Sequence, residues 1–257
     1  MIDFATAILG IAAATLFPAL VGLYVSTLAN VSRSRLLAAY GLGIFLWYFS
    51  DTIGGSSYLD VNSGFSGGLA HVGLLTVFVL AFLVVFAVHG WGLHIEQMAY
   101  ASSMVIPALV AAALSIHGFG EGVSFGTFAS AGLTPRLADS VSYMLHKALE
   151  AVMVGTCYLV YSHDRAGRLR LNDLVALGMI LAVPSAIGVA LGYYVPFDVA
   201  YAFAAATGAS VYVAFSLARP LFEARFVSSP NPESMKLTLM LLFGFISIYF
   251  AALFHSA

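Results

Sequence analysis

The chain carries little charge, since only 9% of its 257 residues are Asp, Glu, Lys or Arg. A soluble domain normally has about 25% charged residues, because its surface must face water. Hydrophobic residues make up 61% of the chain, and the mean hydropathy is +0.97. Such a composition cannot cover a water-exposed surface, so we expect the protein to be solvated by lipid.

Other classes of protein are excluded by what the chain lacks. Cys157 is the single cysteine, so no intramolecular disulfide can form, and we interpret it as a small buried apolar residue. The net charge is -2 and no acidic or basic tail is present, so no nucleic-acid partner is indicated. The first apolar stretch has no basic segment before it, and we interpret it as a membrane span rather than a cleavable signal peptide.

Eight apolar runs of roughly 18 or more residues predict an all-α, polytopic membrane protein formed by a single domain, 1–257. Their approximate limits are 4–29, 36–58, 69–93, 100–127, 138–161, 172–195, 198–218 and 236–255. The break at Pro196 and Asp198 is short, so the sixth and seventh runs could be read as one. Together, however, they are too long for a single crossing.

The basic residues predict the orientation of these spans. Odd-numbered loops hold eight of the ten: Arg33, Arg35, Arg165, Arg168, Arg170, Arg219, Arg225 and Lys236. The even-numbered loops hold only Arg136. By the positive-inside rule the odd-numbered loops are cytoplasmic and both termini lie outside. We therefore expect a multi-pass protein of the cell membrane.

The remaining basic residue, Lys147, lies within the fifth span beside other ionisable residues. The fourth span contains His117 and Glu121, and the fifth contains His146 and Glu150. In each His-x-x-x-Glu pair the two side chains lie on one helical face, one turn apart. Ionisable groups inside a bilayer are costly and usually face a bundle interior or an aqueous path, so each is a functional candidate.

The two spans are joined by a short connection, residues 129–136, which predicts antiparallel neighbours. Their facing sides would then present two His and two Glu, a donor set that suits Zn²⁺, Fe²⁺ and Mn²⁺. The two carboxylates would neutralise a divalent ion, and the lack of thiolates favours release. Hydrogen bonding between helices is the alternative for any one of these residues, but the repeated pair favours a metal site.

Asp51 is a fifth candidate, in the second span toward its outer end. It could be a further metal ligand or a charge on the access side of the site. It could equally form an ion pair with Lys147 or cap a broken helix.

The segments that begin at His117 and at His146 resemble known transporter motifs. Residues 117–122 read His-Gly-Phe-Gly-Glu-Gly and resemble the fourth-span motif His-Asn-x-Pro-Glu-Gly of the ZIP metal transporters. Residues 146–151 read His-Lys-Ala-Leu-Glu-Ala and resemble the family's fifth-span motif, often His-Glu-x-Pro-His-Glu, which has a His-Lys version in one branch.

The resemblance implies cation uptake toward the cytoplasm through an inverted 3+2+3 repeat, in which a four-helix unit slides against a scaffold. It also implies a set of metal ligands: His117, Glu121, His146 and Glu150. Asp51 falls near a position where some members place a second-span ligand.

Departures from the family pattern predict a single metal site. Gly118 stands at the Asn position and Lys147 at a position that is often acidic, and both positions help to build a second site in binuclear members. The charge of Lys147 would repel a second cation, or replace it as a fixed counter-ion for Glu121 and Glu150. An acidic ligand from the sixth span is also missing from residues 181–188.

We therefore expect a transporter of a divalent transition-metal cation, of the Zn or Fe/Mn class, and not an enzyme. The expected partners are the metal ion and the lipid bilayer, with a homodimer left open, and no prosthetic group is expected. One alternative is an intramembrane zinc hydrolase, although no His-Glu-x-x-His motif is present. Another alternative is a metal sensor that does not transport. A third is a retinal-binding photoreceptor with a Schiff base on Lys147.

Overall fold

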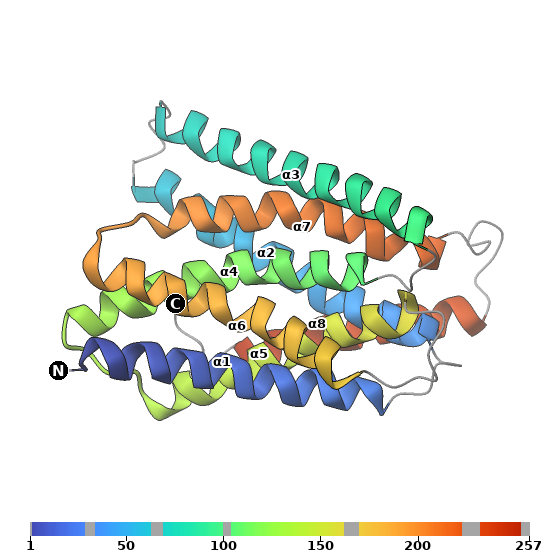
Figure 1. Cartoon of the computed structure of the whole chain (residues 1–257), viewed down its shortest axis with the longest axis horizontal. Helices are drawn as coiled ribbons and strands as arrows, with labels where there is room; N and C mark the ends of the chain where they lie inside the picture. Colours follow the sequence, from blue (N-terminus) through green and yellow to red (C-terminus); the bar gives the residue numbers. More distant parts are fainter. Residues whose placement is uncertain are drawn as a thin grey trace.

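The computed structural model is entirely α-helical in the part of the chain it describes, residues 2–28, 34–62, 69–99, 104–161, 170–222 and 232–252 (Figure 1). The helices are α1 (Phe4–Thr27), α2 (Ser34–Asn62), α3 (Leu69–Ala99), α4 (Val105–Ser130), α5 (Leu137–Tyr161), α6 (Leu171–Tyr194), α7 (Val199–Phe222) and α8 (Pro232–Ala252). Each predicted run coincides with one helix, so the all-α class and the division into eight helices are confirmed.

The sixth and seventh runs form separate helices. α6 ends at Tyr194, and α7 begins at Val199 after an exposed stretch that contains Pro196. Proline lacks the N–H that would continue the first helix. Asp198 then accepts a 3.0 Å hydrogen bond from the backbone N–H of Ala200, as an N-terminal capping residue does.

Several helices could cross a membrane, which indicates a membrane protein. By length and composition, five of the described helices qualify: α1, α2, α3, α4 and α6. Two shorter apolar helical segments lie in α7 and α8, over Val199–Ala214 and Met235–Ala251. α5, which carries His146, Lys147 and Glu150, is not among these helices. Eight crossings, and the topology that they imply, stay predictions.

Burial is inverted relative to a water-soluble protein. Large apolar side chains face outward, including Leu69, Leu9 and Phe250, which are 65–90% exposed. The ionisable side chains of His146 and Lys147 are instead buried in the bundle. This pattern places the apolar surface where lipid would solvate it and the charges where protein can satisfy them.

The helices pack in two groups of four. In one group α4 packs along α6, and α1 packs along both α5 and α6. In the other, α2 packs along α7 and α8, and α3 packs along α7 at the edge of the bundle (Figure 1). We call these the α1/α4/α5/α6 group and the α2/α3/α7/α8 group. They meet mainly where α2 contacts α5 and α4 contacts α7.

Glycines bring backbones together inside each group. A Cβ on Gly122 of α4 would lie 2.1 Å from the carbonyl oxygen of Ser185 on α6, and a Cβ on Gly43 of α2 would lie 1.9 Å from that of Leu241 on α8. The same tight approach to a carbonyl oxygen recurs within the groups at Gly22, Gly126, Gly188, Gly192, Gly208 and Gly244. Helices this close are locked in register, because any side chain would separate them.

Contacts between the two groups are made by side chains instead. A Cβ on Gly120 of α4 would meet the Cβ of Ala202 on α7 at 3.2 Å. On the other side, a Cβ on Gly41 of α2 would meet Oγ1 of Thr156 on α5 at 2.9 Å. Side chains can adjust where backbones cannot, so the boundary between the groups is more permissive than the contacts inside them.

Candidate metal centre

α4 places His117 and Glu121 on its buried face, one helical turn apart. Their Nε2 and Oε1 atoms lie 3.4 Å apart, and the exposed fractions of the two side chains are 2% and 8%. The helix runs without interruption through this segment despite its glycines. The sequence pattern therefore predicted correctly that imidazole and carboxylate share one face.

α5 presents the second pair and the lysine. Nε2 of His146 and Oε1 of Glu150 lie 2.8 Å apart, within hydrogen-bond distance. Nζ of Lys147 donates a 2.8 Å hydrogen bond to Oε2 of Glu150 and also forms an ion pair with Glu121 of α4. One ammonium group thus joins the carboxylates of the two helices.

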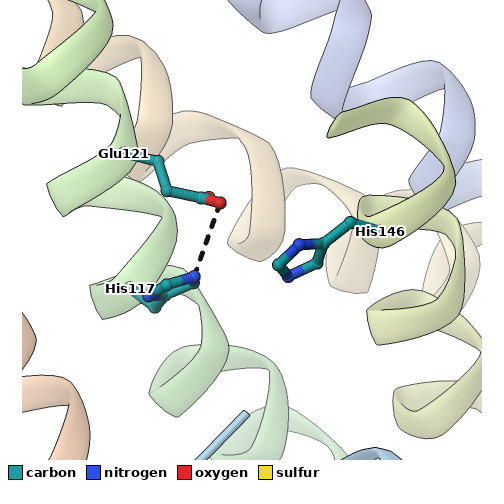
Figure 2. A group of neighbouring side chains, drawn as sticks. All are labelled: His117, Glu121 and His146. Carbon is teal, nitrogen blue, oxygen red and sulfur yellow. Dashed lines mark ion pairs between the residues drawn. The ribbon is translucent and has the colours of Figure 1, made fainter. Parts of the chain in front are cut away.

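His117, Glu121 and His146 converge on one small volume between α4 and α5 (Figure 2). Each offers one ligand atom, and the three atoms lie within 4.8 Å of one another. Ligand atoms sit about 2.0–2.2 Å from a bound zinc ion, so two ligands of one ion are separated by up to about 4.4 Å. Small side-chain movements would bring these three atoms into that range. The arrangement can therefore hold a divalent cation.

Asp51 reaches the same cluster from the other group of helices. Its Oδ2 lies 3.5 Å from Nε2 of His117, and its side chain is 39% exposed. α2 continues through this position to Asn62, so the alternative of a cap on a broken helix is wrong. Among the described residues Lys147 pairs with Glu121 and Glu150, and no ion pair joins it to Asp51. The position fits either remaining role, a further ligand or a charge on the access side.

Formal charge favours a divalent ion. The cluster contains three carboxylates, those of Asp51, Glu121 and Glu150, and one ammonium group, that of Lys147, which pairs with the two glutamates. With neutral imidazoles the cluster carries a surplus of two negative charges. Buried charge is costly unless it is compensated, and a divalent cation would compensate this surplus.

Aromatic rings enclose the two imidazoles. The rings of Tyr48 and Phe203 lie 5.1 and 5.3 Å from that of His117, and Trp47 lies 5.1 Å from His146. Oη of Tyr48 donates a 2.9 Å hydrogen bond to the carbonyl oxygen of Ala113. These walls exclude water and strengthen electrostatic interactions in the site. Sequence reasoning missed them, although Trp47 and Tyr48 lie about one turn before Asp51; nothing in the sequence pointed to Phe203.

Tyr143 extends the cluster toward α1. Nζ of Lys147 lies 5.5 Å from the centre of the Tyr143 ring, one turn earlier in α5. The Tyr143 hydroxyl lies 2.8 Å from Oγ1 of Thr15 on α1, and both side chains are buried. The spacing of four residues from Lys147 was the available signal for Tyr143, whereas Thr15 had none.

A scan against protein-family models and a search of curated proteins find no match to this chain.

Proposed function

We propose that the protein is a ZIP-like transporter that carries a divalent transition-metal cation, of the Zn or Fe/Mn class, across the cell membrane toward the cytoplasm. The cargo binds at a single site between α4 and α5. Its ligands are drawn from His117, Glu121, His146 and Glu150, and Asp51 contributes from α2. The motifs of residues 117–122 and 146–151 support the family assignment.

One observation carries this proposal. Three ligand atoms of types that borderline metal ions prefer lie within 4.8 Å of one another inside an otherwise apolar helical bundle. Ionisable groups so placed usually mark an ion or substrate path. The absence of thiolates suits a site that must release its ion.

Helix packing is consistent with an inverted 3+2+3 repeat. α1 packs along α5 as α6 packs along α4, and α2 packs along α8 as α7 packs along α3. α2 also contacts α5 as α7 contacts α4. Such a repeat relates α1–α3 to α6–α8 about the central pair α4 and α5, with both termini outside.

The two helix groups support a sliding mechanism. The α1/α4/α5/α6 group carries four cargo ligands, and its glycine contacts lock it together as a unit. The α2/α3/α7/α8 group would serve as the scaffold and carries Asp51. Movement of one group past the other would separate Asp51 from His117 and expose the site to the opposite side.

Transport and metal choice are tested together in vesicles. The purified protein is reconstituted into proteoliposomes, and uptake of Zn²⁺, Fe²⁺, Mn²⁺, Co²⁺ and Cd²⁺ is measured, with Ca²⁺ as a control that prefers oxygen ligands. Saturable uptake of one or more transition metals, but not of Ca²⁺, is expected. Metal binding near one ion per chain without any flux would favour a sensor. An absorbance scan of the purified protein checks the photoreceptor alternative.

A further inference from the structure

Ser185 of α6 has a buried hydroxyl beside Gly118 and Lys147 of the metal centre. The side chain is fully buried, and Oγ has no hydrogen-bond partner in the described part of the chain. Buried polar side chains nearly always have a partner, so an unsatisfied one needs an explanation. We therefore consider the groups that lie next to Ser185 Oγ.

Gly118 lets α4 pack closely against this hydroxyl. A Cβ at position 118 would lie 2.7 Å from Oγ of Ser185, 3.8 Å from the carbonyl oxygen of Leu181 and 3.9 Å from Nζ of Lys147. Two oxygen acceptors of α6 and the ammonium group therefore border the same point. Because Gly118 has no side chain, no atom of residue 118 beyond its backbone separates the Ser185 hydroxyl from the ammonium group.

Lys147 needs an alternative position when metal binds. Its ammonium group is paired with Glu121 and Glu150, and Glu121 belongs to the cluster that can hold the ion. A cation that takes these carboxylates removes the partners of the ammonium group and also repels it. An ammonium group has three donors and no acceptor, so it requires oxygen atoms wherever it moves.

We propose that the Lys147 ammonium group moves past Gly118 toward α6 when the metal binds, with Ser185 Oγ and the Leu181 carbonyl oxygen as its acceptors there. This inference rests on the proposed function and describes how the same site is regulated. Ser185 is then a positioning residue, which acts on the metal through Lys147. Oγ of Ser185, which has no hydrogen-bond partner among the described residues, then gains one when the cargo binds.

The first test compares Ser185→Ala with Ser210→Ala, another fully buried serine, whose hydroxyl bonds within its own helix. Zn²⁺ affinity and the Zn²⁺-induced rise in Tm are measured on the detergent-purified full chain. Ser185→Ala should leave the metal-free Tm unchanged or slightly raised and weaken Zn²⁺ binding about fivefold, roughly the loss of one hydrogen bond. Ser210→Ala should leave Zn²⁺ affinity unchanged.

Gly118→Ala supplies a second test. The added Cβ should lower the metal-free Tm by crowding Ser185 Oγ, and should also weaken Zn²⁺ binding by standing between the ammonium group and its new acceptors. The double variant with Ser185→Ala removes the crowded oxygen, so its metal-free Tm should recover while Zn²⁺ binding stays weak. Recovery of both would mean that crowding alone weakened binding and would overturn the proposal.

A third test asks whether the effect of Ser185→Ala on Zn²⁺ affinity depends on Lys147. In a Lys147→Met background the Ser185→Ala change should no longer affect Zn²⁺ affinity, since the moving group is gone. An equal loss in both backgrounds, or no loss in either, would overturn the inference while leaving transport intact. If the wild-type protein binds no Zn²⁺, the proposed function itself fails, and the inference fails with it.

Discussion

Nε2 of His117 lies 3.5 Å from Oδ2 of Asp51, across the boundary between the two groups of helices. The imidazole is buried and belongs to α4, whereas the carboxylate is partly exposed and belongs to α2. A contact of this kind can deliver an ion from a more accessible residue to an enclosed one. It must also break if the groups slide past each other.

Asp51→Asn should therefore impair capture of the cargo more than its translocation. The change removes one negative charge from the accessible edge of the site but leaves the buried ligands in place. We expect the KM for Zn²⁺ uptake to rise about tenfold, equivalent to roughly 1.4 kcal/mol, with a smaller change in maximal rate. Initial rates in proteoliposomes measure both quantities. Equal loss of rate at all Zn²⁺ concentrations, with KM unchanged, would contradict a role in capture.

Lys147→Ala should destabilise the metal-free protein. Removal of one partner from a buried ion pair typically costs about 3–5 kcal/mol, because the remaining charges are uncompensated. Here Glu121 and Glu150 would repel each other until a cation binds, so the Zn²⁺-induced rise in Tm should exceed that of the wild type. Loss of the positive charge should also allow a second ion to bind.

Lys236→Ala, at an exposed lysine of α8, is the matched control and should change neither property. Thermal unfolding with chelator or Zn²⁺, together with metal analysis of the bound protein, gives both readouts. Unchanged stoichiometry combined with unchanged metal-free stability would rule out the counter-ion role.

Much of this arrangement could be predicted from the sequence. The four-residue spacing of His117 and Glu121, and of His146 and Glu150, fixes each pair on one face, and the short connection makes their helices neighbours. Periodicity within one helix, however, says nothing about which other helix packs against it. Phe203, Thr15 and Ser185 belong to distant segments, so their approach to the site depends on tertiary packing.

The packing of the helices could not be predicted from the sequence either. Glycine content suggested close approach, but only the structure separates Gly122, which touches the backbone of α6, from Gly10, which has no atom of another element within 4 Å. Both read alike as glycines within an apolar run. Their difference lies in the surroundings and not in the local pattern.

Gly122→Ala should destabilise the protein strongly. Its Cβ would lie 2.1 Å from the Ser185 carbonyl oxygen, so α4 and α6 must move apart, a distortion that typically costs about 1–3 kcal/mol. Gly10→Ala is the control and should be neutral or stabilising by up to about 1 kcal/mol, because alanine favours the helix. Thermal unfolding in detergent compares the two. Similar Tm values for both variants would contradict the locked contact between α4 and α6.

Zn²⁺ affinity should fall as the pH is lowered. Imidazole binds metal only in its unprotonated form, so protons compete with the metal for any histidine ligand, and histidine as a residue type exchanges its proton between about pH 5 and 8. Equilibrium titrations at several pH values should show steadily weaker binding toward the acidic end. The same measurement on Lys147→Ala separates competition at the histidines from any contribution of the lysine. Affinity independent of pH over this range would exclude the two histidines as ligands.

Transport through a site between α4 and α5 is tested by Zn²⁺ uptake into proteoliposomes that contain the wild type, His117→Ala or Glu150→Ala, with His71→Ala as a control for loss of a histidine elsewhere. We expect saturable uptake by the wild type and by His71→Ala, and its loss in the other two variants. Uptake that persists in both His117→Ala and Glu150→Ala would contradict a transport site between α4 and α5.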